Sequence, residues 1–118
     1  MSKVTLIDIE LEHAVRRERF VRDAWKYLAK IKDVCRRLDA DCKVFVFSSF
    51  IKGGFRSNSD IDVLIVTKLA SNPLVRGALF KAIAIEIGLD NPFELHIVTE
   101  EEYLRVYRRF IDVSQEIT

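Results

Sequence analysis

Residues Val44 to Val66 read V-F-V-F-S-S-F-I-K-G-G-F-R-S-N-S-D-I-D-V-L-I-V, in which two apolar runs flank a segment rich in serine and glycine. Both runs have the length and the β-branched content of buried strands. Asp60 and Asp62 open the second run, and side chains two residues apart on a strand point to the same face. Paired carboxylates opposite a loop rich in backbone N–H groups can hold a divalent cation together with a polyphosphate. The stretch therefore predicts a cation and phosphate site at the end of a sheet.

These residues resemble the signature of the minimal nucleotidyltransferases, which are small members of the DNA polymerase beta superfamily. That signature is Gly-Ser followed at a set distance by Asp-x-Asp. Here Ser48-Ser49, the segment 50–59 and Asp60-Ile61-Asp62 have the same spacing. The resemblance covers residues 43–98 and implies a nucleotidyltransferase fold, of the α/β (α+β) class, with a small mixed sheet flanked by helices.

The resemblance also implies the residues of an active site. Asp60, Asp62 and Glu94 would be catalytic and would bind Mg²⁺ or Mn²⁺, with ATP as the nucleotide substrate. The nucleotide would be bound by Ser48, Ser49, Lys52, Gly53, Arg56 and Ser59. His96 shares a strand face with Glu94, so it either orients Glu94, or approaches the metal, or is a structural histidine with a partner of its own.

Two positions depart from the family pattern, and they keep two functions open. Ser48 stands where the signature has glycine, and Glu94 stands where aspartate is more frequent. A Cβ at position 48 could crowd a phosphate that approaches the backbone. The first function is the transfer of a nucleoside monophosphate, AMP from ATP, to a hydroxyl group. The second is a catalytically degenerate nucleotidyltransferase-fold module that acts by protein–protein interaction.

Length and composition limit the remaining classes. The 118 residues, with 49% hydrophobic and 31% charged side chains, predict one globular domain over residues 1–118. A net charge of +1 argues against a bulk electrostatic affinity for nucleic acid, so no nucleic-acid partner is expected. No signal peptide or membrane-spanning run is recognised, so the expected compartment is the cytoplasm. Cys35 and Cys42 lack the spacing of a zinc or redox motif, and Cys35 is expected in the core.

Periodicity predicts the remaining elements. Residues 1–11 are interpreted as an arm or a short strand, and residues 12–39 as one long amphipathic helix. The core of residues 43–98 contains strands over 43–48, 60–67 and 93–98, with a helix that starts at Asn72-Pro73 and stops at Gly88. A capping box at Thr99–Glu102 begins a last helix over residues 100–111. The final residues are expected to fray.

The charge of the helices raises the question of a partner. Between Glu12 and Leu38, nine lysines and arginines stand against four acids, a local net charge of +5. This excess is either a solvated helix face or a partner surface. The resembling family often acts beside a helical protein of the HEPN type, as the antitoxin of a toxin–antitoxin pair, and adenylylates a tyrosine on it. Arg105, Arg108 and Arg109 beside Tyr103 and Tyr107 would suit such an interface, and self-association through the N-terminal arm is the competing use.

Overall fold

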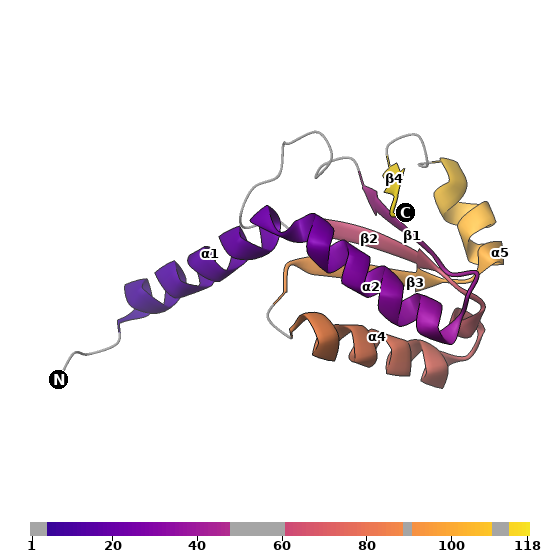
Figure 1. Cartoon of the computed structure of the whole chain (residues 1–118), viewed down its shortest axis with the longest axis horizontal. Helices are drawn as coiled ribbons and strands as arrows, with labels where there is room; N and C mark the ends of the chain where they lie inside the picture. Colours follow the sequence, from indigo (N-terminus) through magenta and orange to yellow (C-terminus); the bar gives the residue numbers. More distant parts are fainter. Residues whose placement is uncertain (1–4, 48–60, 89–90, 110–113) are drawn as a thin grey trace.

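A four-stranded mixed sheet forms the centre of the protein (Figure 1). The structure, a computed structural model, describes residues 5–47, 61–88, 91–109 and 114–118. Its strands, in chain order, are β1 (Lys43–Phe47), β2 (Ile61–Val66), β3 (Phe93–Val98) and β4 (Ser114–Glu116), and their spatial order is β3-β2-β1-β4. β1 runs antiparallel to β2 and β4, whereas β2 and β3 are parallel.

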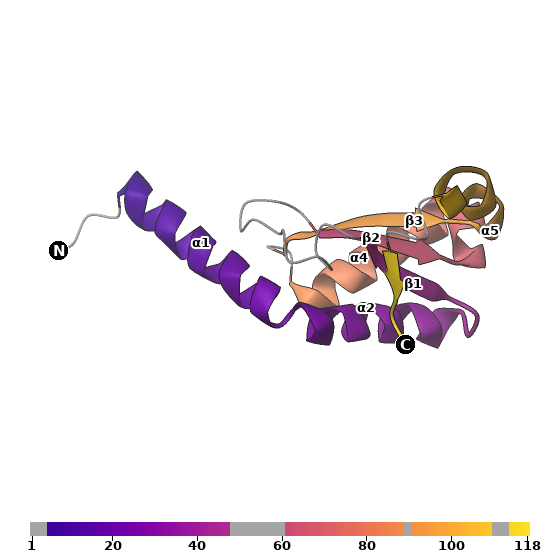
Figure 2. The same cartoon turned by 90° about the horizontal axis from the view of Figure 1, so that it is seen from above.

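Helices cover both faces of this sheet, as Figure 2 shows from above. On one face lie α2 (Ala24–Leu38) and α4 (Pro73–Ile87), and on the other lie α5 (Glu100–Glu102) and η2 (Tyr103–Tyr107), a π-helical turn that continues it. The larger core is packed under α2 and α4, and it includes Leu28, Ile31, Val44, Val46, Val63, Ile65 and Ile83. Full burial of each such side chain stabilises the fold by about 2 kcal/mol. A mixed sheet flanked by helices, as predicted, is therefore confirmed.

Local sequence signals set the bounds of α4 and α5 as predicted. The Asn72 side chain accepts hydrogen bonds from the backbone N–H groups of Leu74 and Val75, and Pro73 occupies the first turn. Gly88 ends α4 at a φ of 99°, in the region that favours glycine. Thr99 and Glu102 form the predicted capping box of α5. These signals act over three or four residues, so they can be recognised without knowledge of the fold.

The N-terminal prediction is wrong in two respects. Residues 6–11 form neither an arm nor a strand, because α1 (Leu6–Arg22) already begins at Leu6. Thr5 caps this helix: its Oγ1 accepts from the Asp8 N–H at 3.2 Å, and the Thr5 N–H donates to Asp8 Oδ2 at 3.1 Å. The helix expected over residues 12–39 is also divided, because Asp23 has φ −101° and ψ 17°. From Ala24 onward the chain packs on the sheet, whereas α1 extends away from it.

The C-terminal prediction is corrected too. The final residues were expected to fray, but β4 pairs with the outer edge of β1, and the Ile117 N–H donates to the Val44 carbonyl at 2.8 Å. Ile117 is buried in the larger core. The expected last helix becomes a π-helical turn after Glu102, and its predicted end at residue 111 lies outside the described residues. No helix in the described part of the chain is long and apolar enough to cross a membrane.

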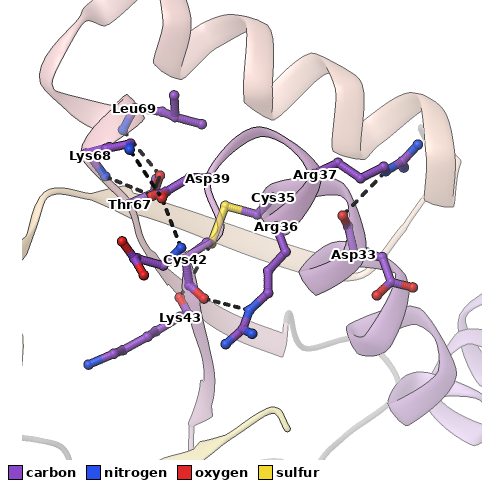
Figure 3. Close-up of a disulfide and its surroundings, with 11 residues drawn as sticks. Asp33, Cys35, Arg36, Arg37, Asp39, Cys42, Lys43, Thr67, Lys68 and Leu69 are labelled. Atoms are coloured by element: carbon purple, nitrogen blue, oxygen red, sulfur yellow. Dashed lines mark hydrogen bonds and ion pairs between the residues drawn. A yellow bond between two sulfur atoms is a disulfide. The ribbon is translucent and has the colours of Figure 1, made fainter.

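A disulfide and a set of hydrogen bonds stabilise the turn between α2 and β1 (Figure 3). Cys35 and Cys42 form a disulfide across it, and both are fully buried. Burial of Cys35 was expected, but its pairing with Cys42 was not. Asp39, 3% exposed, accepts hydrogen bonds from Thr67 Oγ1 at 2.7 Å, from the Lys68 N–H at 3.3 Å and from the Asp41 N–H at 3.1 Å. The carboxylate therefore ties this turn to the end of β2.

Removing the disulfide should lower the free energy of unfolding. The bridge joins residues seven apart in sequence, and closing so short a loop stabilises a fold by about 2.5 kcal/mol through the entropy of the unfolded chain. We expect a loss of that size in urea unfolding of a Cys35→Ala/Cys42→Ala variant. Wild-type protein refolded under reducing conditions controls for packing, because its sulfur atoms remain. Equal stability of the oxidised and reduced wild type would contradict this expectation.

Candidate functional site

Two neighbouring strands place a pair of carboxylates side by side. Asp62 is the second residue of β2 and Glu94 is the second residue of β3, and the parallel register sets them opposite each other. Their side chains share the sheet face on which Leu64 and Val66 pack, because Phe93 and Ile97 belong to the core on the opposite face. This is the end of the sheet where β1 stops and β2 and β3 begin. The carboxylates therefore lie at an open end of the sheet, as the sequence pattern suggested.

His96 joins these two acids. Its Nε2 lies 3.4 Å from Asp62 Oδ1 and 3.9 Å from Glu94 Oε1. One ligand atom from each of the three residues falls within 4.8 Å of the others. About half of each carboxylate side chain is exposed, 43% for Asp62 and 55% for Glu94, so an ion could reach them from solvent. We refer to Asp62, Glu94 and His96 as the trio.

The donor set of the trio fits a divalent cation. Carboxylate oxygens suit Mg²⁺ and Mn²⁺, while an imidazole nitrogen suits Mn²⁺ and later transition metals better than Mg²⁺. Opposed carboxylates repel each other, and a cation between them removes that repulsion. Residues Asp62 and Glu94 could thus hold the ion, with His96 as a third ligand or as the hydrogen-bond partner that orients Asp62.

Two cavities meet at the trio. A cavity of about 270 Å³ is lined by Phe47, Asp62, His96 and Tyr107. A second cavity, of about 500 Å³, runs beside β3 and α4, and it shares His96 and Tyr107 with the first. The rings of these two residues lie 6.3 Å apart at an interplanar angle of 51°. These two side chains line both cavities, so the larger cavity is adjacent to the trio at His96.

An ion pair between Arg76 and Glu102 lines the larger cavity. Arg76 donates to Glu102 Oε1 at 3.1 Å and also to the Ala70 carbonyl. Burial alone would raise the pKa of Glu102, but hydrogen bonds from Thr99 and the charge and hydrogen bond of Arg76 outweigh it, so the pKa lies below its ordinary value. Glu102 is therefore ionised at neutral pH and holds Arg76 in place. A ligand in this cavity would meet the positively charged Arg76 side chain among apolar side chains that include Phe80 and Leu95.

The remaining predicted site residues lie outside the described part of the chain. They are Ser48, Ser49, Lys52, Gly53, Arg56, Ser59 and Asp60. Their assignment to the nucleotide and the metal stays a prediction from the sequence. The described residues on either side of this segment are Phe47 and Ile61, which end β1 and begin β2. β1 therefore ends, and β2 begins, at the end of the sheet that carries the trio.

Sequence reasoning left His96 undecided and did not assign Tyr107 to the site. The alternation of Glu94 and His96 on one strand was the usable signal for the histidine. Tyr107 lies one helical turn after Tyr103, and both rings face the sheet, where Tyr103 stacks on Phe45 at 5.8 Å. The two tyrosines had been considered as part of a partner surface. In the structure they are half-buried and pack against a second, smaller core on the other face of the sheet, formed by Phe45, Leu64, Val66 and Val98.

Comparisons with known proteins agree on the fold. A crystal structure described as a "putative nucleotidyltransferase" superposes with a TM-score of 0.62 at 27% identity, covering 76% of this chain and 96% of its own. Another, described in the same words and from Sulfolobus solfataricus, gives a TM-score of 0.52 at 18% identity, covering 88% and 85%. At 18% identity the likeness shows the fold alone. No curated protein matches the chain.

A family model identifies the domain itself. The model of the nucleotidyltransferase domain matches residues 28–116, a range that extends from α2 to β4 and includes the whole trio. It also spans the Ser48-Ser49 and Asp60-x-Asp62 motif. The chain therefore belongs to the nucleotidyltransferase domain family.

Proposed function

We propose that this protein is a metal-dependent adenylyltransferase, which moves AMP from ATP to a hydroxyl group. The observation that carries the proposal is the trio, which lies at the end of the sheet where β1 ends and β2 and β3 begin. Membership of the nucleotidyltransferase domain family supports nucleotidyl transfer in general. The choice of ATP, and of Mg²⁺ or Mn²⁺ as the cofactor, is the part that experiment has to test.

The residues have separate roles in this proposal. Asp62 and Glu94 hold the cation, with Asp60 as the further carboxylate that the motif supplies. A divalent cation bound there would neutralise charge on the triphosphate and lower the pKa of the attacking hydroxyl. Ser48, Ser49, Lys52, Gly53, Arg56 and Ser59 contact the nucleotide. His96 fixes the orientation of the Asp62 carboxylate through their 3.4 Å contact.

The reaction is a displacement at the α-phosphorus of ATP. The acceptor oxygen forms a bond to the α-phosphorus. The bond between the α-phosphorus and the oxygen that bridges it to the β-phosphorus breaks, and pyrophosphate leaves with that oxygen. The hydroxyl proton passes to Glu94, which is the most exposed member of the trio and lies on the edge strand of the sheet among the described residues. Glu94 acts here as the general base, so its carboxylate must be within hydrogen-bond reach of the acceptor.

The acceptor is proposed to be a tyrosine of a helical partner protein of the HEPN type. The larger cavity beside β3 and α4, of about 500 Å³, has room for a single side chain of a partner, such as that of a tyrosine. Because both cavities are lined by His96 and Tyr107, an aromatic hydroxyl in the larger cavity would lie close to the trio and to the reacting end of the nucleotide. Arg105, Arg108 and Arg109 are exposed residues of the same segment as Tyr107, which lines the cavity, and could contact the partner.

Binding of ATP with a cation is the direct test. We expect ATP with Mn²⁺ or Mg²⁺ to raise the melting temperature, because a ligand that binds only the folded state stabilises it by mass action. ATP labelled at the α-phosphate should transfer label to the co-expressed product of the neighbouring gene, with a mass increase of one AMP. GTP, CTP and UTP in parallel would identify the nucleotide. A Glu101→Gln variant, altered at an exposed acid of α5, should behave as the wild type.

The outcomes separate the two functions. Binding together with transfer supports the adenylyltransferase. Metal-dependent ATP binding without transfer to any acceptor would favour the degenerate binding module, for which the serine at position 48 is the observation in the sequence. The absence of any response to ATP with either cation would contradict the assigned site.

A further inference from the structure

The first helix exposes apolar side chains that the domain does not cover. In α1, Leu6 is 71% exposed, Ile7 67%, Leu11 59% and Val15 47%. Figures 1 and 2 both show α1 extending away from the sheet and its covering helices, and it joins them through α2. Isolated helices of about 15 residues are marginally stable in water, and most helical stability in proteins comes from packing of an apolar face. A helix of 17 residues with this surface therefore calls for a partner.

Four residues of α1 form an apolar stripe on one side of the helix, whereas Ile9, 41% exposed, lies on another side. Ile7, Leu11, Ala14 and Val15 follow the spacing i, i+4, i+7, i+8, which places them on one face. Leu6 lies off this face, since it is five residues from Leu11 and a turn contains 3.6 residues. The stripe has the 4-3 spacing of a coiled-coil seam.

Charge along α1 is divided between its halves. The first half carries Asp8, Glu10 and Glu12, whereas four arginines lie between positions 16 and 22 against the single acid Glu18. Two such helices side by side in the same direction would bring acids against acids and arginines against arginines. In opposite directions, the acidic half of each would face the basic half of the other, and Asp8 would lie near the partner's Arg22. Charge complementarity of this kind sets orientation in helix pairs.

We infer that two copies of this chain associate through an antiparallel pair of α1 helices, with the stripe of Ile7, Leu11, Ala14 and Val15 as the seam. The centre of the pair lies near Ala14, between the acidic and the basic half, so Ala14 and Val15 meet their own copies while Ile7 and Leu11 lie against the C-terminal half of the other copy's α1. β2 and β3 begin, and carry the trio, on the side of the sheet from which α1 extends, while α1 itself points away from the sheet (Figure 1). The inference does not depend on the proposed adenylyl transfer, so either can fail alone.

Solution mass tests the association. Light scattering on the full chain should give twice the 13.7 kDa of one chain. A Leu11→Glu variant, which places a charge in the seam, should give 13.7 kDa. Leu6→Glu is the matched control: it makes the same change on the same helix but off the seam, and it should remain a dimer. Both leucines are exposed in the single chain, so neither variant removes a core contact.

Chemical cross-linking tests the orientation. A thiol introduced by Ala14→Cys lies near the centre of the pair and should join two chains through a short bismaleimide. The thiol of Ile7→Cys should not, because in an antiparallel pair centred near Ala14 its copies are about 20 Å apart along the axis. The native Cys35 and Cys42 are buried in a disulfide and do not compete for the reagent. Adding Leu11→Glu to Ala14→Cys should abolish the link.

Three results would overturn the inference. The first is a monomeric wild type at the concentrations used for cross-linking. The second is dissociation of the Leu6→Glu and Leu11→Glu variants to the same extent, which would exclude the stripe as the seam. The third is cross-linking of Ile7→Cys as efficient as that of Ala14→Cys, which would show a parallel pair.

Discussion

Replacement of Asp62 by asparagine is expected to reduce adenylyl transfer by about 1,000-fold, because loss of a metal-binding charge removes several kcal/mol of transition-state stabilisation and each 1.36 kcal/mol is tenfold in rate. Asp62 faces Glu94 across the parallel ladder and accepts the contact from His96. Asparagine keeps the size of the side chain and removes its charge. The measurement is the initial rate of label transfer from ATP at saturating Mg²⁺ or Mn²⁺, together with the rise in melting temperature that ATP and metal produce.

The stability of this variant should not fall. Asp62 is 43% exposed at the beginning of its strand, and removing one of two opposed carboxylates relieves repulsion. The unliganded melting temperature is therefore expected to be equal to that of the wild type or slightly higher. Glu101→Gln is the control for loss of a surface charge. A variant that keeps transfer within tenfold of the wild type, or an unchanged thermal response to ATP and metal, would remove Asp62 from the site.

The parts of the fold that the sequence predicted are those with short-range signals. The Asn72-Pro73 start, the Gly88 stop and the Thr99–Glu102 capping box act within one turn, and each was found where expected. β3 was predicted at its observed bounds, Phe93–Val98, because its side chains alternate between core and exposed face. The same alternation put Glu94 and His96 on one face of the strand. None of this needed knowledge of which strands are neighbours, whereas the position of Glu94 opposite Asp62 depends on the parallel pairing of β2 and β3.

The elements that were missed depend on contacts distant in sequence or on weak local patterns. β4 consists of Ser114, Gln115 and Glu116, which carry no apolar alternation, and it exists because the edge of β1 can accept hydrogen bonds. The apolar pattern of α1 continues without glycine or proline into α2, so the bend at Asp23 had no sequence mark. Trp25, in the first turn after that bend, is 46% exposed.

The buried carboxylate of Asp39 was also missed, and its removal should have the second large effect. The sequence showed it only as the residue that ends a helix. In Asp39→Asn, the side-chain oxygen that accepts from the Asp41 N–H is kept. An amide N–H₂ replaces Oδ2, which accepts from the Lys68 N–H in the wild type. A buried donor left without its acceptor costs about 1–3 kcal/mol. We therefore expect the free energy of unfolding at pH 7 to fall by about 2 kcal/mol.

The pH dependence distinguishes this cause from a packing defect. Burial would raise the pKa of Asp39, but the hydrogen bonds from Thr67, Asp41 and Lys68 and the Lys68 charge outweigh it, so the pKa lies below 3.8. A carboxyl group with a lowered pKa stabilises the folded state above its ordinary pKa, and that contribution is lost as the pH falls through the folded-state value. Urea unfolding at a series of pH values should therefore show the difference between wild type and variant shrinking below about pH 4.

Two further comparisons make this test specific to Asp39. Glu102 and Asp8, whose pKa values are also lowered, titrate equally in both proteins, so their effects cancel in the difference. Asp41→Asn changes an exposed acid of the same turn, and surface substitutions of this kind stay within about 0.5 kcal/mol of the wild type. A loss in Asp39→Asn that persists undiminished at pH 2.5 would mean that shape, and not the ionised carboxylate, explains why this turn needs aspartate. A loss of stability confined to neutral pH would establish that the ionised Asp39 carboxylate holds the α2–β1 turn to the end of β2.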